Sequence, residues 1–148
     1  MLKIPEPAWK QVPGLVALVD EMARDGRERD DPMREIFARL GDRWSMLILL
    51  VLRTGTYRHA ALKRLIGELG AEGKISQRML TLRLRGLERD GLVRQTQIPS
   101  KAPHVEYDLT RLGHDLLAQT DALMGWIRAH GDQIAESRRA FDRRQIEE

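Results

Sequence analysis

Apolar residues in the first half of the chain recur with the spacing of amphipathic helices. Four segments show the i, i+3, i+4, i+7 pattern that places apolar side chains on one helix face. They predict helices over residues 13–26, 32–41, 42–52 and 62–70. Asp31 followed by Pro32 is typical of a helix start. The 42–52 segment is apolar on most faces after Ser45, which predicts a central, buried helix.

A second pattern begins after a glycine-rich loop over 67–74. Ser76 is a suitable N-cap residue, and Leu80, Leu84 and Leu87 then mark one face of a helix over 76–90. Asp90 and Gly91 end it. The sequence therefore predicts a short helix with one buried leucine face and an arginine-bearing opposite side.

The remaining pattern changes from alternating to helical. Residues 92–98 and 105–109 alternate apolar and polar positions and flank a Pro- and Lys-containing tip, which predicts a β-hairpin. Thr110 is the predicted cap of a long helix through His130. The apolar residues of that helix are Leu112, Leu116, Leu117, Leu123, Met124 and Ile127. Beyond Gly131 the chain is polar, and we expect a frayed helical tail from Glu136.

Length and composition narrow the classes of protein. The 148 residues correspond to about one domain. The chain has no cysteine, which excludes disulfides, thiolate metal ligands and cysteine-based catalysis or redox sensing. Its longest apolar run, Met46–Leu52, is far shorter than the ~20 residues of a membrane span, and the N-terminus lacks a signal-peptide core. We expect a cytoplasmic protein that has no membrane partner.

Positive charge is concentrated in the middle of the chain. Residues 53–104 carry eleven basic and four acidic side chains, a net charge of +7, whereas residues 1–52 and 105–148 carry −1 and −3. Such clustering is typical of modules that bind a polyanion. The alternative is a solvated, arginine-rich helical surface.

The order helix, helix, turn, arginine-bearing helix and hairpin is that of a winged helix-turn-helix. The predicted fold is mainly α, with a two-stranded β-wing and additional N- and C-terminal helices. A helix fits the DNA major groove, and its exposed residues reach base edges while the wing contacts phosphate or the minor groove. The predicted DNA-binding residues are Ser76, Gln77, Arg78, Thr81, Leu82, Arg85, Lys101 and His104.

Three segments carry a family resemblance: LGDRWSMLILL, ISQRMLTLRLRGLERDGLV and HVEYDLTRLGHDLL. They resemble the HxlR-type family of bacterial winged helix-turn-helix regulators, relatives of the MarR group, over roughly Asp31 to His130. The resemblance implies a homodimer that binds inverted half-sites on double-stranded DNA. It also implies dimerisation through the terminal helices, here roughly Pro13–Arg24 and Thr110–His130.

The sequence departs from that family pattern at three places. Asp31 stands where many relatives have a cysteine that senses oxidants or electrophiles, so thiol sensing is excluded here. His59 stands where an aromatic residue is usual, with Tyr57 nearby as a substitute. The loop over 67–74 is longer than the usual turn into the recognition helix.

Other chemistry is weakly supported. The four histidines lack metal-ligand spacing, and no catalytic or phosphate-loop motif is present, so we expect no metal, no cofactor and no enzyme activity. Trp44 and Trp126 could line a pocket for a non-covalent small-molecule effector, although core packing is the simpler interpretation.

The prediction is therefore a dimeric, sequence-specific DNA-binding regulator, more plausibly a repressor than an activator because repression requires only promoter occupancy. It has an N-terminal extension (1–30), a winged helix-turn-helix domain (31–130) and a polar tail (131–148). The alternative is a winged-helix protein-interaction module without DNA binding.

Overall fold

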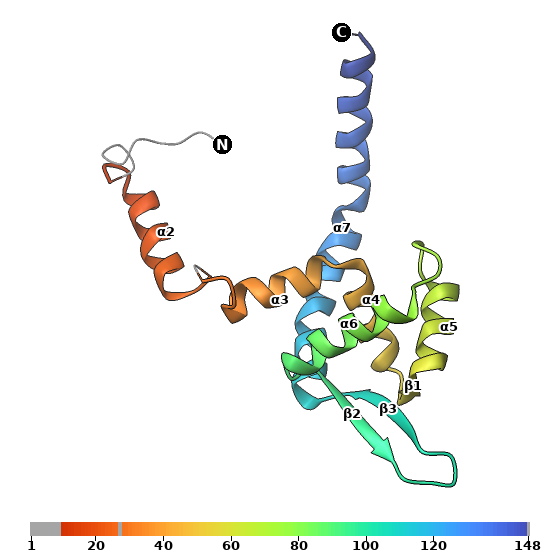
Figure 1. Ribbon diagram of the computed structural model, residues 1–148. Coiled ribbons are helices and arrows are strands. Elements are labelled where there is room, and N and C mark those ends of the chain that lie inside the picture. Colours follow the sequence, from red (N-terminus) through yellow and green to blue (C-terminus); the bar gives the residue numbers. More distant parts are fainter. Residues whose placement is uncertain (1–9, 27, 148) are drawn as a thin grey trace. The chain divides into compact units, whose positions relative to one another are not determined.

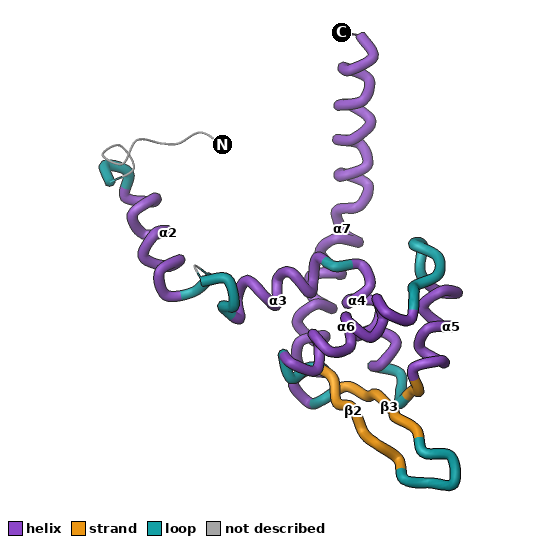
Figure 2. The backbone as a smooth tube through the Cα atoms, in the orientation of Figure 1, coloured by secondary structure: helices purple, strands orange, loops and turns teal. Residues whose placement is uncertain are grey.

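The computed structural model describes residues 10–26 and 28–147, so residues 1–9 of the predicted N-terminal extension and the last residue of the predicted tail lie outside it. Figures 1 and 2 show a mainly helical chain with one small antiparallel sheet. The helices are α2 (Pro13–Arg24), α3 (Pro32–Gly41), α4 (Arg43–Leu52), α5 (His59–Leu69), α6 (Gln77–Arg89) and α7 (Arg111–Glu147). The strands are β1 (Tyr57–Arg58), β2 (Val93–Ile98) and β3 (His104–Leu109). This arrangement confirms the predicted winged-helix fold class.

The chain divides into two compact units, Met1–Met46 and Leu47–Glu148. In the first unit, the Asp31 carboxylate accepts a hydrogen bond from Met33 N at 2.8 Å and caps α3, as the Asp-Pro pair predicts. Neither α2 nor α3 contains a buried residue. Several of their apolar side chains are exposed, among them Met22 at 47% and Phe37 at 65%, whereas Leu15 and Ile36 are half-buried. Both helices thus carry exposed apolar side chains in the described part of the first unit.

The core of the second unit is built mainly from leucines and isoleucines of four helices. Its fully buried side chains include Ile48, Leu49 and Leu52 of α4, Leu62 and Ile66 of α5, Leu80, Leu84 and Leu87 of α6, and Leu117 of α7. The prediction that the 42–52 helix is central and buried is confirmed. At its end, the Arg53 guanidinium pairs with Asp121 of α7 at 2.9 Å. Because both side chains are partly exposed, this ion pair contributes little stability.

The sheet has the strand order β1-β3-β2, and both pairings are antiparallel. The hairpin register runs from Val93 opposite Leu109 to Ile98 opposite His104, which confirms the predicted wing. The sequence analysis did not find β1. This strand has only two residues, and it forms through pairing with β3 rather than through any alternation of its own.

Helix α7 differs from the prediction at its end. The expected frayed tail from Glu136 is wrong, because one 37-residue helix continues to Glu147. Ion pairs join Glu136 to Arg139 at 2.9 Å and to Arg143 at 3.3 Å along the helix surface. Contacts of this kind between helix neighbours support a polar helix that has no core to pack against.

The other end of α7 is fixed against the base of the wing. Thr110 Oγ1 accepts a hydrogen bond from Gly113 N at 3.1 Å, as expected of a cap, and donates one to Gly91 O at 2.6 Å. A Cβ atom at Gly113 would lie only 2.3 Å from Leu92 O. The close approach therefore requires glycine, and it turns Gly113, Leu117 and Thr120 toward the core. Leu123 and Ile127 are consequently about half exposed, at 52% and 48%.

Candidate nucleic-acid interface

Helix α6 is held by its N-cap and by its leucines. Ser76 Oγ accepts a hydrogen bond from Met79 N at 3.1 Å and so satisfies an otherwise unpaired helix amide. Leu80, Leu84 and Leu87 are at most 1% exposed. Despite the long preceding loop, α6 is therefore firmly packed, and its opposite side is fixed in orientation.

Five of the predicted DNA-binding residues lie together on that outer side. Gln77, Arg78, Leu82 and Arg85 are exposed and Thr81 is half-buried. The same five residues line one surface groove of about 480 Å³. The groove combines two guanidinium groups, an amide, a hydroxyl with its methyl group, and an apolar side chain. These are the group types that hydrogen-bond or contact base edges in the major groove.

The sequence analysis did not find the contact between His59 and this surface. His59 Nε2 lies 3.0 Å from Thr81 Oγ1, and Thr81 Oγ1 donates a hydrogen bond to Gln77 O at 2.9 Å. Because the hydroxyl has one proton, His59 Nε2–H is the donor to Thr81. Partial burial lowers the pKa of His59, and the nearby charge of Lys63 lowers it further. The neutral ring thus bridges α5 and α6 and holds the Thr81 hydroxyl.

The wing carries the other two predicted residues in different settings. Lys101 is exposed in the loop that joins β2 and β3 (Figure 2). His104 is half-buried, with Nδ1 at 3.1 Å from Ala102 O and Nε2 at 3.0 Å from a Glu106 carboxylate oxygen. The His104 ring is therefore engaged within the wing, whereas the Lys101 ammonium is accessible to a phosphate.

The two tryptophans suggested for an effector pocket lie in different compact units. Trp44 is half-buried at the start of α4. Trp126 is 56% exposed on α7 and stacks on the His130 ring at 4.5 Å between centroids. Core packing is thus the wrong interpretation for Trp126 within this chain.

The described residues hold no cluster of three or more His, Cys, Asp or Glu that could bind a metal ion. Over the same part of the chain, no helix is both long enough and apolar enough to span a membrane.

Comparison with known proteins agrees with the fold. The architecture and the exposed face of α6 define a winged helix-turn-helix regulator. Residues 39–135 match the model of the HxlR-like helix-turn-helix family, and the chain belongs to that family. It is similar to the HTH-type transcriptional regulator YtfH of Escherichia coli (strain K12), with 41% identity over 96 residues, 65% of this chain and 71% of YtfH. The protein is thus a transcriptional regulator with a helix-turn-helix DNA-binding domain rather than an enzyme.

Solved structures show the same relationship. The regulator ytfH from Salmonella typhimurium has a TM-score of 0.58 and 36% identity, with 75% of this chain and 94% of that chain covered. A regulator of the MarR family from Enterococcus faecalis V583 has a TM-score of 0.58 and 32% identity, with 73% of this chain and 96% of that chain covered. The redox regulator HypR, in its reduced form, has a TM-score of 0.59 and 28% identity, with 72% of this chain and 99% of that chain covered. The present chain has no cysteine and so cannot use a thiol as a redox sensor.

Proposed function

We propose that this protein is a dimeric, sequence-specific repressor that binds inverted half-sites through α6 and the β2–β3 wing. The observation that carries the proposal is the groove shared by Gln77, Arg78, Thr81, Leu82 and Arg85 on the free side of a firmly packed helix. A helix of this kind enters the major groove with its N-terminal half toward the bases.

Each side chain of the groove has a role that follows from its chemistry. Arg78 and Arg85 match the paired acceptors of guanine, and Gln77 matches adenine. The Thr81 hydroxyl is already hydrogen-bonded to Gln77 O and His59, so its methyl group is the part offered to DNA, and a thymine methyl is its partner. Ser76 and Lys101 contact phosphates, and His104 shapes the wing. These phosphate contacts orient the protein more than they select sequence.

The test compares the DNA affinities of two variants, Arg78→Ala and Lys101→Ala, with that of the wild-type protein. A bound fragment is first selected from genomic DNA, and affinities are then measured by fluorescence anisotropy for this fragment and for random duplex. Arg78→Ala should weaken specific binding by about 1–3 kcal/mol and relax the preference at one base pair. Lys101→Ala should weaken both duplexes equally and reduce the salt dependence of binding by about one phosphate.

Two outcomes would contradict the assignment. Equal losses of Arg78→Ala on both duplexes would remove Arg78 from base reading. Absence of any DNA binding at low salt would favour the winged-helix interaction module instead, since the +7 charge of residues 53–104 should at least produce nonspecific binding.

Dimerisation is supported by large apolar side chains that are exposed among the residues the structure describes. In α2, Leu18, Val19 and Met22 are 39–47% exposed. In α7, Leu123, Trp126 and Ile127 are 48–56% exposed. Such contiguous apolar surface is typical of an interface with a partner. Two copies also present two recognition helices, which a palindromic site with half-sites ~34–36 Å apart requires.

The dimer is tested by light scattering at micromolar concentration. Leu123→Asp places a charge in the exposed apolar face and should shift the mass from two chains to one. Arg128→Asp, which changes an exposed position on the side of α7 away from Leu123 and Trp126, should leave the dimer intact. A monomeric wild-type protein would overturn this part of the proposal.

A dimer that occupies a promoter blocks transcription without any further contact surface, so we propose repression, in the cytoplasm where chromosomal DNA lies.

A further inference from the structure

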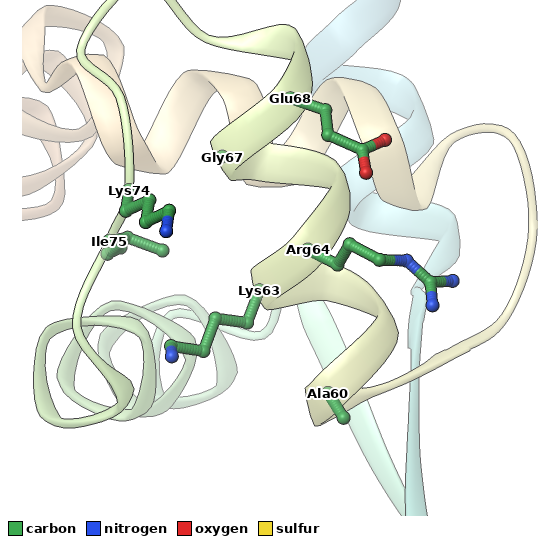
Figure 3. A pocket seen from close by; sticks show the side chains of 7 residues that line it. All are labelled: Ala60, Lys63, Arg64, Gly67, Glu68, Lys74 and Ile75. Atoms are coloured by element: carbon green, nitrogen blue, oxygen red, sulfur yellow. The ribbon is translucent and has the colours of Figure 1, made fainter.

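A second pocket lies next to α6, between α5 and the segment that leads into α6. It measures about 470 Å³ and is lined by Ala60, Lys63, Arg64, Gly67, Glu68, Lys74 and Ile75. Figure 3 shows Lys63 extending from α5 and Lys74 from the opposite segment, into the space between them. Arg64 and Glu68 extend from another side of α5.

The pocket has the composition of a small-molecule site for an anion. Its volume lies within the ~300–1,000 Å³ range of ligand pockets. Two ammonium groups approach it from opposite walls, and neither has an ion-pair partner among the residues the structure describes. Ala60, Gly67 and the buried Ile75 supply apolar walls. Because Gly67 has no side chain, the space beside Lys74 stays open.

Two contacts connect this pocket to the DNA-reading face. Lys63 lies close enough to His59 for its charge to act on the ring, and His59 holds the hydroxyl of Thr81 in α6. Ile75, which is 2% exposed, directly precedes the Ser76 cap of α6. One intervening residue, His59 on the first path and Ser76 on the second, therefore separates the lining of this pocket from the groove of α6.

We propose that this pocket binds a small-molecule oxyanion, a phosphorylated or polycarboxylated metabolite, between Lys63 and Lys74, and that its occupancy weakens DNA binding. The negative charge lies beside the surface that must meet DNA phosphates, and it offsets the potential that attracts them. The coupling is reciprocal, so bound DNA lowers affinity for the anion by the same factor. The inference rests on the proposed DNA-binding function for its regulatory part only.

The alternative occupant of the two lysines is the DNA backbone itself. The observations favour a free ligand, because the ammonium groups belong to facing walls of a recess with apolar residues between them, whereas phosphate contacts need only exposed cations. The two sources of oxyanion make different demands on the chain. A DNA phosphate needs the lysines alone, but a free ligand also needs the empty volume at Gly67.

The binding arm uses no DNA. ¹⁵N-labelled protein is titrated with pyrophosphate and with citrate, with ionic strength held constant by sodium chloride. We expect saturable shifts of backbone amides within residues 60–76 for at least one of the two probes. Lys63→Gln/Lys74→Gln should weaken that binding by about tenfold or more, the loss of charge-assisted hydrogen bonds. Lys101→Gln removes an ammonium group outside the pocket and is the control for this arm: it should leave the anion-induced shifts unchanged.

A pocket-filling variant separates volume from charge. Gly67→Met keeps both lysines and fills the recess, and its helix is not weakened because Met is a better helix former than Gly. A Cβ at this position makes only ordinary contacts, the nearest at 3.7 Å from Lys74 Cγ. We expect Gly67→Met to abolish the anion-induced shifts and to bind the selected genomic fragment like wild type.

The DNA arm measures affinity for that fragment with and without the bound probe. The anion should weaken wild-type binding by about fivefold or more and leave Gly67→Met unaffected. Absence of saturable shifts in residues 60–76, or shifts unchanged in the double lysine variant, would overturn the site. Saturable shifts with no change in DNA affinity would overturn the regulation alone. If the double lysine variant loses DNA affinity without any anion, and the wild-type protein shows no saturable anion-induced shifts, the lysines contact the DNA backbone and the proposal is wrong.

Discussion

Replacement of Gly113 by alanine tests how α7 is attached to the wing. The new Cβ would lie 2.3 Å from Leu92 O, whereas an ordinary close contact between carbon and oxygen is about 3.3 Å. A gap of about 1 Å must therefore open between α7 and the start of β2. Thr110 N donates to the same Leu92 oxygen at 3.1 Å, so the shift also strains that hydrogen bond.

The expected magnitude follows from three contributions to the free energy of unfolding. Forcing an extra carbon into a packed site costs about 1–3 kcal/mol, and the strained hydrogen bond costs about 1 kcal/mol. The better helix propensity of alanine offsets about 1 kcal/mol. Gly113→Ala should thus destabilise the protein by about 2 kcal/mol, which lowers the Tm by about 4–8 °C at this chain length.

The same helix offers a matched control. A Cβ at Gly125 has no heavy atom within 4 Å, so Gly125→Ala changes helix propensity alone. It should stabilise the protein by about 0.5–1 kcal/mol. Thermal unfolding followed by circular dichroism compares both variants with wild type at one protein concentration, because the stability of the proposed dimer would depend on concentration. Equal Tm shifts for the two variants would refute the close contact at Gly113.

Two further predictions concern His59 and Ser76, which lie beside the proposed DNA-binding face of α6. His59 has a lowered pKa in the folded protein, so the unfolded chain binds the proton more tightly. The contribution of neutral His59 to the free energy of unfolding is therefore fully present above about pH 6.5, the pKa in the unfolded chain, and is lost as pH falls through the folded pKa. His59→Gln keeps a donor to Thr81 without titrating, and urea unfolding at pH 7 and pH 5 should show a smaller loss for the variant; the same loss in both proteins would contradict this role of His59. Ser76→Ala should cost about 1 kcal/mol of stability through loss of the cap on Met79 N. Ser76→Asp should keep the cap but weaken DNA binding by charge repulsion, and an aspartate variant that binds DNA like wild type would place Ser76 away from the phosphates.

The sequence predicts those helices and strands in which buried apolar residues recur at the regular spacing of a helix or a strand. The α6 leucines recur at helical spacing, so the same pattern that buries Leu80, Leu84 and Leu87 also predicts the exposed set around Arg78. The alternation of 92–98 and 105–109 predicts the wing for the same reason. These features depend on neighbours within a few residues.

Features that depend on distant contacts were not predictable. His59 and Thr81 are 22 residues apart and meet only because α5 crosses α6 in the fold. The pocket between Lys63 and Lys74 requires the path of the loop after Gly70, which composition does not specify. Ion pairs along its own surface support the continuation of α7 beyond Glu136, and the few apolar residues of this segment did not indicate where the helix ends.

The length of α7 has a geometric consequence for the operator. At ~1.5 Å per residue its 37 residues extend about 55 Å, longer than the ~34–36 Å between two half-sites. Residues 136–147 extend past the segment shared with the family model, and Phe141 continues the spacing of Ile127 and Ile134 in steps of seven. In the dimer that we propose, the point at which a second copy crosses α7 sets the distance between the two α6 helices. A substitution far from any nucleotide can therefore change which operator spacing the protein accepts.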